Sequence, residues 1–178
     1  MRILILCLAV ALSACVASQA PAPQSPNLVR LDASFADSKW QGGLPSDEVC
    51  KKFNTRPGNA PSIKVSGLPA ATATIELSFN DTTASNKVFD RGGHGIIHYQ
   101  IPNPGAGEVV IPSFPGQTNQ LPAGFSVKRN FTSQAWDSGR GYLPPCSGGR
   151  GHAYTVDIRA LDAQGARLAE TNLSLGMY

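Results

Sequence analysis

The stretch that decides the fold is Gly141-Tyr142-Leu143-Pro144-Pro145-Cys146, followed after a glycine-rich run, residues 148–151, by His152-Ala153-Tyr154. The Pro-Pro step fixes two φ angles and removes two amide donors. The glycine-rich run lets the backbone approach another group closely, and His152 stands where an alternating strand pattern begins. This combination indicates that residues 141–146 form the rigid rim of a ligand site.

Alternating apolar and polar residues on either side of this rim indicate β-strands. Residues 74–79 place Ile75, Leu77 and Phe79 on one face, and residues 154–160 repeat the pattern. A period of two means a strand half buried against a core. Gly and Pro, 18 and 14 residues, separate the segments. The sequence therefore predicts an all-β sandwich. Further strands are expected at 28–31, 62–65, 96–101, 108–111 and 168–175, with one short helix around 47–53.

Short motifs on both sides of the rim occur in the order typical of one family. They are Ala60-Pro61-Ser62-Ile63-Lys64-Val65, Tyr99-Gln100-Ile101-Pro102, Leu121-Pro122-Ala123-Gly124, Ala160-Leu161-Asp162 and the rim itself. From about Phe35 to Tyr178 the chain resembles the phosphatidylethanolamine-binding proteins, whose bacterial members are called Raf kinase inhibitor-like proteins. The resemblance implies a Greek-key β-sandwich with few short helices. The family's C-terminal helix is expected to be reduced to a turn at residues 163–166.

The N-terminus has the pattern of an export signal. Residues 1–14 carry one charge, Arg2, ahead of an apolar run. Leu12-Ser13-Ala14-Cys15 resembles a bacterial lipobox, which makes Cys15 the expected acylated residue, and Val16 then favours the outer membrane, facing the periplasm. Ordinary cleavage near Ala17-Ser18 is the alternative. We expect a lipidated tether over residues 15–26 and one domain of this family over residues 27–178.

Two cysteines, Cys50 and Cys146, remain in the exported domain once Cys7 leaves with the signal and Cys15 is acylated. In an oxidising compartment such a pair predicts one disulfide, and two buried free thiols are the alternative.

The family resemblance implies a small anion-binding pocket. Asp81 takes the place of the family's first aspartate, Pro145 belongs to the rim, and His152 keeps the family's histidine. The family's strand histidine falls on Gly95, one residue from His94, and the neighbouring glycines could host a bulge that corrects this slip. The expected ligand-binding residues are therefore Asp81, His94, Pro145 and His152. Thr83 replaces the second aspartate of the family, and Ala153 replaces its arginine.

Other interpretations of these residues stay open. His152 would be structural if it only bonded a backbone carbonyl, and Asn80-Asp81-Thr82-Thr83 also suits an Asx turn. His94 and His98 lie four residues apart without a third ligand at suitable spacing, so no metal site is expected. No cofactor and no enzyme class are expected, because no nucleophile elbow, nucleotide loop or carboxylate pair occurs in the sequence.

The most concrete functional expectation is an envelope lipoprotein that binds a small anionic or phosphate-bearing ligand without turnover. Two other functions stay open: an inhibitor or scaffold of an envelope enzyme, and a hydrolase that uses His152 as its base. A formal charge of +3 is too small to indicate nucleic acid as a partner.

If Cys15 is acylated, the chain should partition into the detergent phase, because several acyl chains at one cysteine exceed what stable anchoring requires. Cys15→Ser should move it to the aqueous phase in a Triton X-114 separation. A soluble wild-type chain that begins at Gln19 or later would contradict lipidation.

Overall fold

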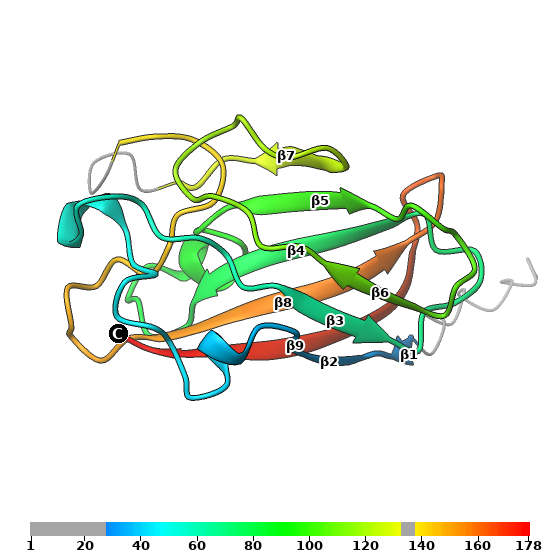
Figure 1. The fold of residues 1–178 in the computed structure, drawn as a ribbon, viewed down its shortest axis with the longest axis horizontal. Coiled ribbons are helices and arrows are strands. Elements are labelled where there is room, and N and C mark those ends of the chain that lie inside the picture. The colour runs from blue at the N-terminus through cyan, green and yellow to red at the C-terminus, as the bar shows by residue number, and fades with distance from the viewer. Residues whose placement is uncertain (1–27, 133–137) are drawn as a thin grey trace, which may run out of the picture.

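The computed structural model describes residues 28–132 and 138–178, and these form two packed β-sheets (Figure 1). The expectations for residues 1–14, Cys15 and the tether concern residues outside these described ranges. The elements are β1 (Val29–Arg30), β2 (Asp32–Phe35), η1 (Ser38–Trp40), η2 (Lys51–Phe53), β3 (Ile63–Ser66), β4 (Thr74–Asp81), η3 (Lys87–Asp90), β5 (Ile96–Gln100), β6 (Glu108–Ile111), β7 (Phe125–Arg129), β8 (Ala153–Leu161) and β9 (Arg167–Met177).

The larger sheet has the strand order β1-β9-β8-β4-β5-β7, and the smaller has the order β2-β3-β6. All pairs are antiparallel except β1 with β9. The longest strands, β8 and β9, form a hairpin, and a turn at residues 162–166 stands where the family would place its helix. The predicted all-β sandwich with a reduced C-terminal helix is thus confirmed. In the described part of the chain, no helix has the length and apolar character needed to cross a membrane.

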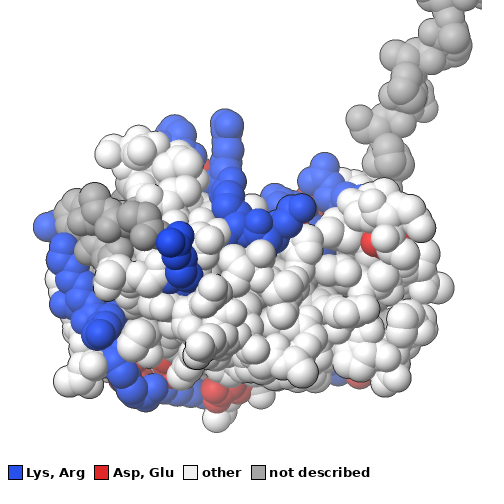
Figure 2. All heavy atoms as spheres, turned by 90° about the horizontal axis from the view of Figure 1, so that it is seen from above, with Lys and Arg blue, Asp and Glu red and all other residues white. Residues whose placement is uncertain are grey.

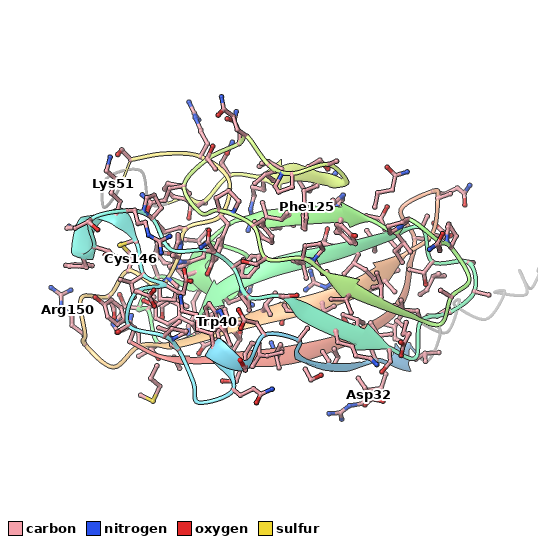
Figure 3. The ribbon with its side chains drawn as sticks, in the orientation of Figure 1. Asp32, Trp40, Lys51, Phe125, Cys146 and Arg150 are labelled. Atoms are coloured by element: carbon pink, nitrogen blue, oxygen red, sulfur yellow. A yellow bond between two sulfur atoms is a disulfide. The ribbon has the colours of Figure 1, made fainter. Side chains whose placement is uncertain are left out.

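The core lies between the two sheets. Ile75, Leu77 and Phe79 of β4 are at most 1% exposed, as their alternation predicts. Their partners across the core come from β3 and β6, where Ile63 and Ile111 are fully buried. Figure 3 shows Trp40 and Phe125 among the packed side chains, whereas Lys51 and Arg150 point outward at one end of the sandwich.

Individual elements differ from the expectations in three places. The strand expected at 28–31 divides at the buried Leu31, so that β1 joins the larger sheet and β2 the smaller. The helix expected around 47–53 is only the one-turn η2. The edge strand β7 was not expected. Phe125 and Val127 do alternate with polar residues, but a segment of five residues that ends in two cations gives a weak strand pattern.

The rim segment lies tightly against the loop before β5. Gly95 has a φ of 109°, and a Cβ there would come within 2.5 Å of the carbonyl oxygen of Gly141. A histidine at position 95, where the resemblance would place the family's strand histidine, would therefore clash with the rim backbone. The expected correction at the neighbouring glycines was also wrong, because the irregularity of β5 lies between Ile96 and Ile97. His94 instead precedes the strand.

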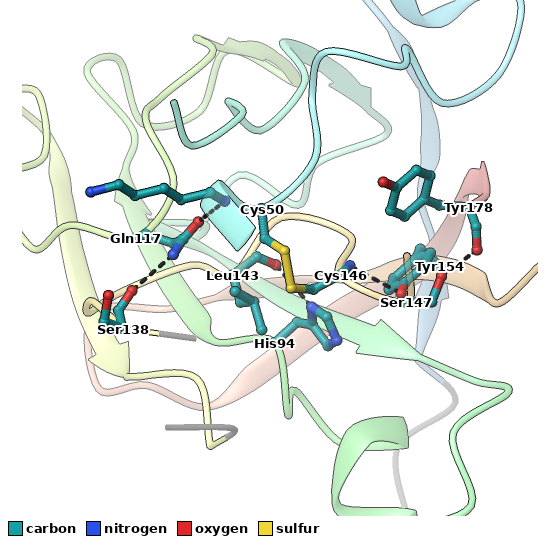
Figure 4. Close-up of a disulfide and its surroundings, with 10 residues drawn as sticks. Cys50, His94, Gln117, Ser138, Leu143, Cys146, Ser147, Tyr154 and Tyr178 are labelled. Atoms are coloured by element: carbon teal, nitrogen blue, oxygen red, sulfur yellow. Dashed lines mark hydrogen bonds between the residues drawn. A yellow bond between two sulfur atoms is a disulfide. The ribbon is translucent and has the colours of Figure 1, made fainter. Parts of the chain in front are cut away.

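A disulfide joins Cys50 to Cys146 and so attaches the loop before η2 to the rim (Figure 4). The backbone N–H of Cys50 also donates to the carbonyl of Pro145 at 3.0 Å. Gln117 adds a second brace, since its side-chain amide accepts from the N–H of Lys51 at 2.7 Å and donates to the carbonyl of Ser138 at 2.8 Å. The predicted pairing is confirmed.

Because the bridge spans 96 residues, its removal by Cys50→Ala with Cys146→Ala should lower the free energy of unfolding. The chain-entropy relation gives on the order of 4 kcal/mol for a loop of this length. Urea unfolding of variant and wild type measures the difference. Mass analysis after alkylation of the native, non-reduced domain should label neither Cys50 nor Cys146, and two labelled thiols would contradict the bridge.

Candidate functional site

The rim closes one side of a cavity of about 520 Å³ at the end of the sandwich. Its walls come from the end of β4 and the loop after it, from His94, from the rim loop between Leu143 and Arg150, and from the start of β8. The antiparallel pairing of β4 with β8 sets Asp81 opposite Tyr154, so the last residue of one strand meets the first residues of the other. A cavity of this size suits a small molecule.

Asp81 and His152 face each other at this junction. The Nδ1 atom of His152 lies 2.6 Å from Oδ2 of Asp81, and Asp81 is only 5% exposed. A carboxylate can only accept, so Nδ1 of His152 carries the hydrogen. The backbone of His152 is held by Tyr178, which accepts at 2.8 Å and donates at 3.0 Å. This leaves Nε2 as the ring nitrogen of His152 that can meet a ligand.

The other oxygen of Asp81 forms the Asx turn that the sequence allowed. Oδ1 accepts from the N–H groups of Thr83 and Ala84, both at 3.0 Å. Thr83 has a structural role here, because its hydroxyl accepts from the N–H of Ala153 at 2.9 Å. The turn and the contact with His152 therefore coexist, each using a different oxygen of Asp81.

His94 is buried in the cavity wall, at 4% exposure. Its Nδ1 atom lies 2.9 Å from the carbonyl of Leu143, and its own carbonyl accepts from the N–H of Leu143 at 2.8 Å. Burial lowers the pKa of His94, although the Leu143 carbonyl and the charge of Asp81 oppose this effect. The ring is thus held in one orientation.

Tyr154 lines the cavity next to the disulfide-bonded Cys146. Its hydroxyl accepts from the N–H of Cys146 at 3.1 Å, as Figure 4 shows. Burial raises the pKa of Tyr154 to about 12, so the phenol is neutral under ordinary conditions. Ser147 donates to the carbonyl of Tyr178 and joins the C-terminal residue to this wall.

Three of the four expected ligand-binding residues, Asp81, His94 and His152, line the cavity together. Pro145 does not, because it is buried behind the wall and its carbonyl bonds Cys50. His98 lies on β5, and its Nε2 bonds Oε2 of Glu76 at 3.0 Å beside a different hollow, away from His94. No group of three potential metal ligands occurs within residues 28–132 and 138–178.

Sequence reasoning missed Phe89 and Arg150, which also line the cavity. Phe89 belongs to η3, a short 3-10 helix without an apolar period, so nothing in the pattern set it apart. Arg150 lies in the glycine-rich run, which is discussed above for its backbone alone. Its position two residues before His152 was the available signal.

The pKa of His94 is lower in the folded chain than the ordinary histidine pKa of about 6.5. Below that pH, an unfolded chain therefore binds more protons at this residue than a folded chain does. The free energy of unfolding should therefore decrease with falling pH below that value, by at most about 1.4 kcal/mol per pH unit for this one group. Urea titrations between pH 7.5 and 5 measure the slope. His94→Asn should remove this part of the dependence, and identical slopes would contradict a neutral buried His94.

Comparison with protein-family models finds no match, and neither does comparison with curated proteins. Comparison with solved structures finds a protein from Chlamydia trachomatis, described as a candidate homologue of the phosphatidylethanolamine-binding proteins. The likeness covers 84% of this chain and 97% of that chain, with 18% identity and a TM-score of 0.49. At this identity and TM-score the likeness concerns the fold alone.

Proposed function

We propose that this domain is a binding module that holds a small anionic or phosphate-bearing ligand in the cavity without turnover. The observation that carries the proposal is the contact of His152 with Asp81 at the cavity wall, which leaves Nε2 of a partly exposed imidazole for a ligand. An N–H at Nε2 donates to an anion, while Nδ1 stays bonded to the carboxylate of Asp81.

The charges at this end of the sandwich favour an anion. Arg150 lines the cavity, and Lys51 and Lys52 are exposed on η2. Figure 2 shows lysine and arginine side chains along the same end, at the left of the view, with few acidic side chains among them on the visible face. Fixed cations raise the local concentration of an anionic ligand and speed its association.

Display at the envelope through an acylated Cys15 is part of the proposal, and the described chain is compatible with it. Its first strand, β1, lies at one end of the sandwich, and the C-terminus and the rim loop lie at the other (Figure 1). An anchor ahead of β1 would therefore leave the cavity end unobstructed.

Apolar side chains near the cavity favour a second candidate, an inhibitor or scaffold that contacts an envelope enzyme. Phe53 is 41% exposed and Met177 is 67% exposed. Gly148 and Gly151 of the rim loop lie against these two side chains. Exposed apolar groups beside cationic ones are common at the centres of protein interfaces.

His152→Ala should weaken ligand binding roughly 10- to 150-fold, the equivalent of about 1.5–3 kcal/mol for a hydrogen bond to a charged group. Titration of phosphoethanolamine, phosphate and acetate, followed by the His152 ring signals in NMR, measures the affinity. The same spectra reveal any hydrolysis of phosphoethanolamine.

The matched control is His98→Ala. His98 is also a partly exposed histidine bonded to a carboxylate, but it lies outside the cavity. The His98→Ala variant should leave the affinity for these ligands unchanged. A lower melting temperature of His152→Ala with an unchanged ligand response would assign His152 to packing. No response of His152 to any of the three ligands would refute the proposed binding and leave protein contacts as the remaining candidate.

A further inference from the structure

The outer face of the larger sheet carries a second polar region, away from the cavity. The inner face packs against the smaller sheet and buries Ile75 and Leu77 of β4. The outer face bears Glu76 of β4 and, opposite it on β5, His98. Glu76 precedes Asp81 by five residues on the same strand, which is roughly 17 Å at about 3.4 Å per residue. The binding described so far does not use this face.

Charged side chains form a row across four strands of this face. The strand register sets Glu170 of β9 opposite Arg159 of β8. Glu76 lies between Arg159 and His98, accepting from Arg159 through Oε1 at 2.9 Å and from Nε2 of His98 through Oε2 at 3.0 Å. Burial alone would raise the pKa of Glu76, but the bonds from His98 and Arg159 outweigh burial and lower this pKa. Glu76 is therefore ionised, and both its oxygens are bonded.

Two hollows lie on either side of His98, whose side chain lines both. One has a volume of about 370 Å³ and is lined by three cations, Lys128, Arg159 and Arg167. The other has a volume of about 390 Å³ and is lined by three uncharged polar residues, Thr74, Gln100 and Ser126. We call these two hollows, which meet at His98, the outer groove. Each hollow is large enough for part of a small molecule.

One half of the outer groove has a positive charge without a partner. Within the described part of the chain, Lys128 makes no ion pair and no side-chain hydrogen bond. The carboxylates nearby are already paired. Glu170 lies 2.9 Å from Arg167, and Asp157 lies 3.3 Å from Arg159. A ligand with an anionic group would therefore give Lys128 the partner that this chain does not supply.

The other half of the outer groove offers uncharged hydrogen-bonding groups. Among residues 28–132 and 138–178, the side chains of Thr74, Gln100 and Ser126 have no hydrogen-bond partner. Hydroxyl and amide groups both donate and accept, as the hydroxyl groups of a ligand do. A carboxylate can only accept, so Nε2 of His98 carries the hydrogen that faces Glu76. In the neutral ring, Nδ1 of His98 is then an acceptor for a ligand hydroxyl.

The position of the outer groove disfavours an extended peptide. The groove lies on the face of β8, β4, β5 and β7, and these strands already pair with one another. An added peptide strand needs unpaired backbone N–H and C=O groups, which occur at the edge of a sheet. A ligand that bonds through its own hydroxyl groups needs only the side chains of the face.

We propose that the outer groove is a second binding site, and that it takes an acidic saccharide. The carboxylate or phosphate group of the saccharide lies against Lys128 and Arg167. Its hydroxyl groups bond His98 and the uncharged half of the groove, Thr74, Gln100 and Ser126. This site is separate from the cavity and does not depend on the function proposed for it.

Five probes test the two halves of the outer groove: glucuronate, glucose 6-phosphate, glucose, acetate and phosphate. The first two carry both an acid group and hydroxyl groups, and the other three carry only one kind. NMR titration of the full chain, followed by the His98 ring and the Gln100 side-chain amide, reports binding at the groove alone. Glucuronate should bind at least about tenfold more tightly than glucose and several-fold more tightly than acetate.

Lys128→Gln should weaken glucuronate binding about tenfold and leave glucose binding unchanged, because only the acid group contacts Lys128. Gln100→Ala should weaken the binding of both sugars and leave acetate binding unchanged. The matched control is Lys64→Gln, which removes the same charge from β3 of the smaller sheet, where Lys64 is exposed. It should change neither affinity. Amide spectra of each variant show that the sheet is intact.

His152→Ala separates the outer groove from the cavity. It should leave the response of His98 to glucuronate and to glucose 6-phosphate unchanged, whatever it does to binding in the cavity. Acidic sugars that shift His152 but not His98, or an equal loss of affinity in Lys128→Gln and Lys64→Gln, would overturn the inference. Equal affinity for glucuronate and acetate would reduce the groove to a bare anion site and also overturn it. So would a polyglutamate peptide that shifts His98 where the sugars do not, since it would assign this face to an acidic protein segment.

Discussion

The pairing of β4 with β8 is the constraint on which the rest of the structure depends. It runs from Thr74 opposite Leu161 to Asp81 opposite Tyr154, at the centre of the larger sheet. Each strand buries alternate residues in the core, so a slip of one residue would expose the buried set. The same register places Asp81 beside His152. Core packing and site geometry are therefore determined by one ladder of hydrogen bonds.

The rim is held against that ladder by contacts of a different kind. The disulfide attaches Cys146 to the loop before η2, and the absence of a side chain at Gly95 lets the rim backbone approach β5. Leu143 then bonds both the backbone and the ring of His94. These contacts keep one wall of the cavity rigid, which limits the entropy that a ligand must lose on binding.

The two histidines of the cavity differ because their surroundings differ. His94 faces a carbonyl and aromatic rings in a buried position, so its ring stays neutral and offers a lone pair. His152 donates from Nδ1 to the carboxylate of Asp81 and is partly exposed, so its Nε2 is the ring nitrogen that remains on the cavity side. The two rings of one cavity are thus held by different partners.

The sequence by itself determined the all-β class, most strands and the disulfide, and it predicted that Asp81, His94 and His152 lie at one site. Period-two patterns, paired cysteines and short motifs are local, and they can be read without knowing what packs against them. Only the tertiary structure decided that β1 and β2 join different sheets, that Pro145 lies behind the wall and that Arg150 lines the cavity. It also decided the tautomer of His94, because Nδ1 bonds the carbonyl of Leu143, 49 residues away in the chain. Such contacts arise from the meeting of loops, and no local pattern encodes them.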